Sequence, residues 1–280
     1  TRSKSTTKQI TISAEDVIYG IRKLPRGKAA GIQGDSIDTY IRLLNKRIPY
    51  RTDIKSLPQH SVAHELATFF SHVANANMGP IERDRNNTIF LVAFHKDPNN
   101  PKKLRPIGVP TAIRRITANI LINKNRSDIA EYLLPFNYAI GVKGGINTIT
   151  NALRLGVEKY ITKPQEKGTL PTRALVSLDI RNMFNAVSRH KLREIIATEF
   201  PHLAPIANSL YKDTHQAKYK DLENNWQTIV VEEGFTQGCP FSPLFAGIVL
   251  THILKKISAK LEKRANQRLA EGREMDDTRG

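Results

Sequence analysis

The chain has 280 residues, 40% of them hydrophobic, so it can bury a core and is not a wholly disordered protein. Lys and Arg number 43 against 26 Asp and Glu, which gives a formal net charge of +17 at pH 7. Because binding to phosphates releases their counterions, a surface of this charge favours nucleic acid as a partner. The alternative at this stage is a soluble basic protein without such a partner.

Cysteine usage and hydropathy indicate the compartment. Cys239 is the single cysteine, which excludes an internal disulfide and a cysteine-based zinc site. No run approaches the ~18 apolar residues of a membrane span, and the N-terminus lacks the apolar core of a signal peptide. We therefore expect an intracellular protein with no membrane partner. The chain begins with Thr1 and ends on a charged tail, which we interpret as a piece of a longer protein.

Residues 1–12 are rich in Lys, Ser and Thr without periodicity, and we interpret them as a flexible basic leader. Ser13, with Asp16 three residues later, resembles a capping box, and apolar residues then recur at helical spacing until Pro25. A second helix is predicted over residues 61–73, because its apolar residues fall on one face.

A hairpin is predicted over about residues 88–109. Residues 88–94 and 104–109 are strand-forming runs, and the turn-forming loop between them carries Lys96, Lys102 and Lys103. Arg105 lies just inside the returning strand. The sequence therefore predicts a hairpin with a cationic tip.

Helices and short strands alternate in the rest of the chain. The predicted helices cover residues 111–135 with a break near 123–127, residues 146–160, a segment capped by Ser188, and about 244–269; a short strand covers 228–231, and residues 201–208 and 210–219 are ambiguous. This mixed order predicts the α+β class with an antiparallel component and not a doubly wound parallel sheet.

Asp179 follows an apolar run, residues 174–178, and precedes a polar segment. The run predicts a buried strand, which would place the carboxylate at the rim of a sheet, where it could bind a metal ion. A turn or helix N-cap is the competing interpretation of such an Asp.

Phosphoryl transfer would explain the hairpin, this acid and a later Gln-Gly bend together, because it requires positioning and charge neutralisation more than covalent chemistry. Lys96 and Arg105 would hold a triphosphate, and Asp179 would bind Mg²⁺. Gln237 and the small Gly238 would let a base pair or a template backbone come close.

Three segments carry a resemblance to a known family. They are Leu104-Arg105-Pro106-Ile107, Leu178-Asp179-Ile180 with Phe184 five residues after the Asp, and Gln237-Gly238-Cys239-Pro240-Phe241-Ser242-Pro243. In sequence, order and spacing they resemble successive motifs of reverse transcriptases, most closely those of non-LTR (LINE-type) retrotransposons and of their relatives in group II introns. The resemblance covers roughly residues 13–269.

This resemblance implies a right-hand polymerase, with fingers and the start of the palm in residues 13–170 and a truncated palm with an antiparallel sheet in 171–280. It implies an RNA template, a DNA primer, deoxynucleoside triphosphates and Mg²⁺, and a nuclear location if the element is eukaryotic. Lys96 and Arg105 would contact nucleotide phosphates, and Asp179 would be a catalytic metal ligand. The remaining implied roles are a backbone carbonyl to the metal from Ile180, a steric gate against the 2′-hydroxyl from Phe184, and contact with the nascent base pair from Gln237 and Gly238.

The family also requires a second acidic motif, Tyr-x-Asp-Asp or similar, between two strands. Asp276 and Asp277 are the only late Asp pair, but residues 270–274 cannot form a buried strand before them. We therefore expect a fragment that ends before this motif and is inactive alone. The alternatives are a group II intron maturase-type enzyme and a nucleic-acid-binding remnant without catalysis.

Overall fold

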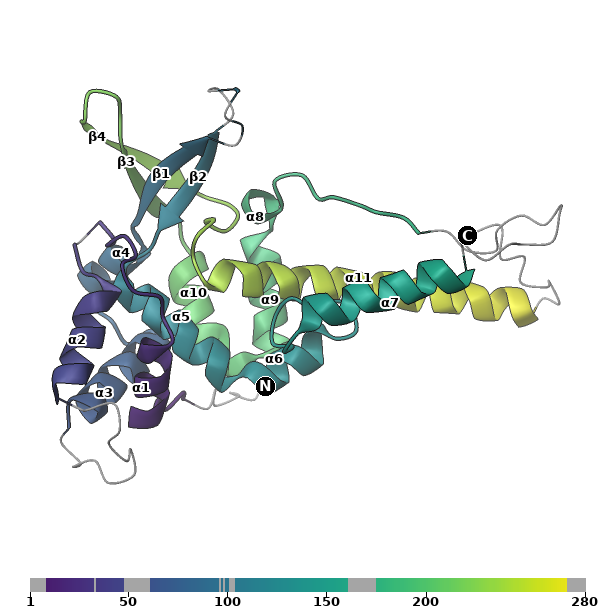
Figure 1. The fold of residues 1–280 in the computed structure, drawn as a ribbon, viewed down its shortest axis with the longest axis horizontal. Helices are drawn as coiled ribbons and strands as arrows, with labels where there is room; N and C mark the ends of the chain where they lie inside the picture. The colour runs from purple at the N-terminus through teal and green to yellow at the C-terminus, as the bar shows by residue number, and fades with distance from the viewer. Residues whose placement is uncertain are drawn as a thin grey trace, which may run out of the picture. The chain divides into compact units, whose positions relative to one another are not determined.

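The computed structural model describes residues 9–32, 34–47, 61–95, 97, 99–100, 104–160 and 175–270. The chain forms two compact units, one of residues 1–126 with 183–246 and one of residues 127–182 with 247–280. Figure 1 shows the helices and strands of both. The expected leader, fingers and palm are functional divisions that these units do not test, so they stay predictions.

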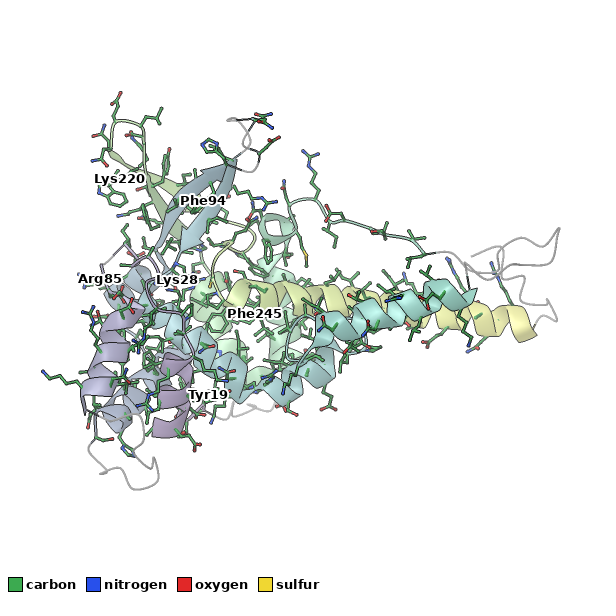
Figure 2. The ribbon with its side chains drawn as sticks, viewed as in Figure 1. Tyr19, Lys28, Arg85, Phe94, Lys220 and Phe245 are labelled. Carbon is green, nitrogen blue, oxygen red and sulfur yellow. The ribbon has the colours of Figure 1, made fainter. Side chains whose placement is uncertain are left out.

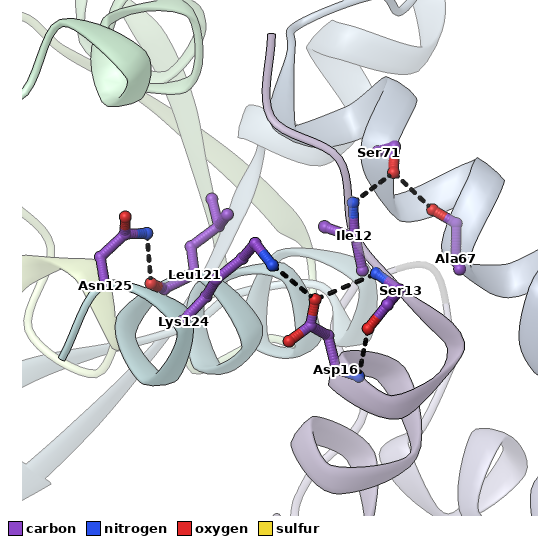
Figure 3. Close-up of polar contacts among 8 residues, drawn as sticks. All are labelled: Ile12, Ser13, Asp16, Ala67, Ser71, Leu121, Lys124 and Asn125. Atoms are coloured by element: carbon purple, nitrogen blue, oxygen red, sulfur yellow. Dashed lines mark hydrogen bonds and ion pairs between the residues drawn. The ribbon is translucent and has the colours of Figure 1, made fainter. Parts of the chain in front are cut away.

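Helix α1 (Ala14–Arg22) begins as its sequence predicts. The Asp16 amide donates to Ser13 Oγ over 3.1 Å, and the Ser13 amide donates to Asp16 Oδ2 over 3.0 Å, which completes the capping box. Lys124 Nζ lies 2.8 Å from the same carboxylate (Figure 3) and so joins this end of α1 to helix α5 (Ala112–Lys124). Ser71 Oγ accepts from the Ile12 amide and anchors the preceding segment to helix α3 (Val62–Ala74).

The first unit buries a core between these helices. Its further helical elements are α2 (Ile37–Arg47), α4 (Pro80–Asn87), α8 (Met183–Ala186), α9 (Arg189–Glu199), the 3₁₀ turn η2 (Pro201–Leu203) and α10 (Ala204–Tyr211). Val17, Ile21, Phe70 and Ile116 are fully buried, one or more from each of α1, α3 and α5. Apolar stripes at helical spacing therefore hold this unit together.

A four-stranded mixed sheet completes the first unit. Its order is β2-β1-β3-β4, with β1 (Ile89–His95), β2 (Leu104–Val109), β3 (His215–Lys220) and β4 (Trp226–Val231). The two hairpins are antiparallel, and β1 pairs with β3 in parallel through residues 89–90 and 217–218. The α+β class and its antiparallel component are thus confirmed, and the parallel pair is an addition that the sequence did not predict.

The second unit contains helix α7 (Gly145–Tyr160) and most of two helices that begin in the first, α6 (Arg126–Leu133) and α11 (Phe241–Ala270). The predicted break between α5 and α6 lies at Asn125. The last helix begins three residues earlier than predicted, because a proline such as Pro243 is tolerated in the first turn, where the amides have no partner within the helix.

The predicted strand over residues 174–178 is wrong. Residue 174 lies outside the described residues, and residues 175–180 have no regular secondary structure. Leu175, Val176 and Leu178 are 58%, 72% and 87% exposed. An isolated strand leaves its backbone groups without ladder partners, and no described strand pairs with this segment. Asp179 therefore does not end a buried strand.

Candidate functional site

The hairpin of β1 and β2 places Arg105 on an edge strand. Arg105 pairs in register with Phe94, and both residues are exposed at the end of the hairpin next to its connecting loop. Figure 2 shows Phe94 on this part of the sheet. Lys96, Lys102 and Lys103 lie outside the described residues. Of the predicted cationic tip, the structure thus describes Arg105, whose exposed guanidinium can bind phosphate oxygens.

The turn that carries Gln237 and Gly238 lies against the other end of β2. The Gly108 amide donates to the Gln237 carbonyl over 2.6 Å. Gly238 has φ of 102°, and a Cβ there would collide with the Gly108 carbonyl oxygen. Position 238 therefore requires glycine for two reasons: its positive φ and its close approach to β2.

Phe184 lies in the short helix α8 and belongs to the same neighbourhood. Its carbonyl accepts from the Phe235 amide over 2.6 Å, two residues before Gln237. Gly234 has φ of 70°, and a Cβ there would collide with the backbone of Asn185. The ring of Phe184 is only half-buried, so it is available to a ligand. The structure thus brings Phe184, Gln237, Gly238 and the strand of Arg105 together within one unit.

Asp179 and Ile180 belong to the second unit, in an exposed segment before Asn182, whose φ is 53°. Asp179 is not a helix N-cap, because the next helix begins only at Met183. The competing cap interpretation of this residue therefore fails. Its carboxylate is open to solvent and able to bind a cation.

A comparison with protein families decides the class of the molecule. Residues 95–272, more than half of the chain, match the family model described as reverse transcriptase (RNA-dependent DNA polymerase). The chain belongs to the reverse transcriptase family. It is accordingly an enzyme by family, an RNA-directed DNA polymerase, and the mixed helix and sheet architecture is consistent with that fold. Template, primer and deoxynucleoside triphosphates are the partners that the family implies.

The seven residues predicted to form the polymerase site all lie within the matched range. Reverse transcriptases as a family use Mg²⁺. Among the described residues, no group of three or more His, Cys, Asp and Glu could hold a metal ion. One open carboxylate, Asp179, still fits Mg²⁺, because this ion keeps several waters and takes other ligands from substrate phosphates.

Two buried arginines hold in place the turn that carries Gln237 and Gly238. The sequence reasoning missed both. Arg189 Nε donates to the Gly234 carbonyl over 2.8 Å, and its Nη1 donates to the Val231 carbonyl over 3.1 Å. Its Nη2 lies 3.4 Å from His215 Nδ1. Arg189 therefore fixes the end of β4 and the bend that leads to Gln237.

Arg114 of α5 holds the other side of the turn. It is fully buried, and it donates from Nε to Cys239 Sγ and from Nη2 to Tyr211 Oη, each over 3.2 Å. Burial raises the pKa of Tyr211 to about 12, so the phenol keeps its proton. Burial and the charges of Arg114 and Arg189 lower the pKa of His215 to about 3, so the imidazole is neutral. One signal could have revealed Arg114: it falls on the same helix face as the apolar Ala118 and Leu121, four and seven residues later, and both are buried.

Among the described residues, no helix is both long and apolar enough to span a bilayer.

Proposed function

We propose that this chain is the polymerase part of a non-LTR-type retroelement reverse transcriptase. The complete enzyme would join the primer 3′-hydroxyl to the α-phosphate of a deoxynucleotide and release pyrophosphate. The observation that carries the proposal is the contact of the Gln237–Gly238 turn with the strand that bears Arg105. A bend that packs on the same strand as a phosphate-binding side chain suits the nascent base pair of a polymerase.

Each predicted residue keeps one role in this proposal. Arg105, with Lys96, neutralises the triphosphate, and Gln237 and Gly238 contact the new base pair. The half-buried ring of Phe184 occupies the space that a 2′-hydroxyl would need, which favours deoxynucleotides.

Asp179 and the carbonyl of Ile180 would hold Mg²⁺. When bound, the ion would supply charge stabilisation at the transferring phosphate. The exposure of Asp179 supports this role, since a ligand carboxylate has to be reachable by substrate.

We further propose that residues 1–280 alone do not extend a primer. A two-metal site needs a second acidic motif, and Asp276 and Asp277, which lie outside the described residues, follow a segment unsuited to a buried strand. A primer-extension assay with an RNA template, a DNA primer, Mg²⁺ and labelled deoxynucleotide tests this. We expect binding without incorporation, and clear incorporation would refute the proposed inactivity.

A binding titration with the same RNA/DNA duplex tests the polymerase assignment separately. The protein should bind the RNA/DNA duplex with an affinity that falls steeply as salt rises. Absence of binding at low salt would contradict a polymerase role.

Two alternatives share these motifs: a group II intron maturase-type reverse transcriptase and a nucleic-acid-binding remnant. The coding sequence that adjoins codon 280 decides among them. An apolar strand ending in Asp-Asp would support the polymerase, and a maturase segment would support the intron enzyme. Absence of both would support the remnant.

A further inference from the structure

One side of the four-stranded sheet is left uncovered within the first unit. Alternate residues of a strand share a side, and the register of the three strand pairs shows which residues belong together. The uncovered side consists of every second residue, counted from the first, of 90–94, 105–109, 216–220 and 226–230. None of these residues is buried. The opposite side, in contrast, contributes Ile89, His215 and Ala217 to the core. We term the uncovered side the open face.

The open face carries positive charge only. Arg105, Lys218 and Lys220 belong to it, and no Asp or Glu does. Asp221 lies in the turn that follows Lys220, but its Oδ2 accepts from Gln227 Nε2 over 2.8 Å, and Gln227 lies on the opposite side of the sheet. A polyanion is therefore the complementary partner of this face.

Aromatic rings accompany these cations. Trp226 is 53% exposed, and its ring centre lies 5.6 Å from that of Phe90 at an interplanar angle of 65°. Lys220 Nζ lies 5.3 Å from the centre of the Trp226 ring and donates to Asn224 Oδ1 over 2.8 Å. Figure 2 labels Lys220 and also Phe94, a third ring of the open face, which is 55% exposed. Exposed rings beside cations suit the bases and phosphates of a nucleic-acid strand.

A single strand fits these groups better than a duplex does. In a duplex each base is paired and stacked inside the helix, so its flat face is hidden from side chains. An unpaired base can stack on the exposed ring of Trp226, while neighbouring phosphates pair with Lys218 and Lys220. The combination of rings and cations therefore selects unpaired nucleotides.

We propose that the open face binds the unpaired stretch of an RNA template. This inference rests on the proposed function, which supplies the template and places Arg105 at the incoming nucleotide. Arg105 of β2 and Trp226 of β4 lie on the same side of one sheet, in the strand order β2-β1-β3-β4. A template strand that leaves the polymerase site can thus continue across the sheet to Trp226. The face keeps this part of the template unpaired before it is copied.

The test uses the single tryptophan of the chain, because intrinsic tryptophan fluorescence reports Trp226 alone. The probe is a single-stranded RNA of about 12 nucleotides without self-complementarity. We expect this RNA to quench the emission and to protect Trp226 from the neutral quencher acrylamide. A blunt RNA/DNA duplex of the same sequence should do neither, because its bases are stacked. Unchanged acrylamide quenching in the presence of the RNA, or equal protection by the duplex, would overturn the proposal.

Ring variants separate stacking from general apolar packing, with the affinity for the labelled RNA measured by anisotropy. Trp226→Leu should weaken RNA binding about tenfold, and Trp226→Phe, which keeps a flat ring, should weaken it less. The matched control is Tyr19→Leu in α1, which removes a ring that is 44% exposed and lies outside the sheet. It should leave the affinity unchanged. Parent-like affinity of Trp226→Leu would overturn the proposal.

Lysine variants test the phosphate contacts in a protein that keeps Trp226, which matters if Trp226→Leu does not fold. The double variant Lys218→Gln, Lys220→Gln should reduce the slope of log affinity against log salt by about 1.4, or about 0.7 for each contact with a single strand. The matched double variant Lys23→Gln, Lys212→Gln changes lysines outside the sheet and should leave the slope unchanged. Equal slopes in the parent and the first double variant would overturn the proposal.

Two further results distinguish other outcomes. If Trp226 becomes protected as the protein concentration rises without RNA, and Trp226→Leu dissociates the resulting oligomer in sedimentation, the face joins two copies of the chain and the proposal is overturned. Duplex binding tests the proposed function separately. A protein that binds the duplex but leaves Trp226 open to acrylamide in the presence of the RNA would refute the template path and not the polymerase assignment.

Discussion

The amide of Gly108 donates a 2.6 Å hydrogen bond to the carbonyl of Gln237, across 129 positions of the chain. This bond joins the hairpin strand of Arg105 to the turn that the proposed polymerase uses for its base pair. We therefore expect any change that separates the turn from β2 to affect nucleotide binding.

Replacement of Gly238 tests this junction. Gly238→Ala forces a Cβ against the Gly108 carbonyl at φ of 102°, and we expect the free energy of unfolding to fall by about 1–3 kcal/mol. Urea unfolding measures it. The matched control is Gly156→Ala in α7, where a Cβ meets nothing within 4 Å, and it should raise stability by about 0.5–1 kcal/mol. Equal stability of Gly238→Ala and the parent protein would contradict the described contact.

The buried guanidinium of Arg114 supplies the second prediction. Arg114→Met leaves Tyr211 and Cys239 without their donor, and it should lower the free energy of unfolding by about 2–3 kcal/mol. The neighbouring Arg115→Met is the control, because Arg115 is only half-buried and donates to the single carbonyl of Ala29. It should cost about 1 kcal/mol. A larger loss of unfolding free energy in Arg115→Met than in Arg114→Met would contradict the stabilising role of the buried Arg114.

His215 gives a pH dependence. Its pKa is lowered to about 3 by burial and by the charges of Arg114 and Arg189, whereas an unfolded histidine titrates near 6.5. The unfolded chain therefore takes up the proton first. This contribution to stability is fully present above pH ~6.5 and is lost as the pH falls towards 3.

Denaturant unfolding between pH 7 and 4 measures the effect of His215. The variant His215→Gln should flatten the profile, and the exposed His190→Gln should leave the His215 contribution in place. A parent profile without a fall below pH ~6.5 would contradict a neutral, buried imidazole.

Phe184 supplies a prediction about sugar choice. With template, primer and Mg²⁺ present, Phe184→Val should bring the affinity for ribonucleoside triphosphates closer to that for deoxynucleoside triphosphates, because it removes the ring from the space of the 2′-hydroxyl. A fluorescent primer–template reports both affinities. Unchanged discrimination would mean that Phe184 serves packing alone.

Local patterns predicted much of the fold. The capping box of Ser13 and Asp16 and the apolar stripes of α3 and α7 need only neighbouring residues, and all three helices are present. Helix α4 was missed because it is polar on nearly all sides and has no apolar period. The apolar run before Asp179 was misread because a strand depends on a partner, which a run of residues cannot reveal.

For the candidate site, the sequence predicts a set of residues and not their geometry. Motif spacing predicted Arg105, Phe184 and Gln237 as site residues, and these roles stay predictions. The contacts that bring β2, α8 and the Gln237 turn together join distant segments, which spacing does not reveal. The roles of Arg114 and Arg189 escaped notice because arginine in a basic chain is taken for surface charge, whereas here both donate inside the core.

The most direct test of the proposed polymerase site is template-directed nucleotide selection in the binding step. The protein is assembled with an RNA template, a DNA primer and Mg²⁺, and the affinity for each of the four deoxynucleoside triphosphates is measured. We predict that the complementary nucleotide binds at least tenfold more tightly than the other three and that Arg105→Gln weakens the binding of all four, because the triphosphate is common to them. Equal binding of all four nucleotides by the parent protein would contradict the account.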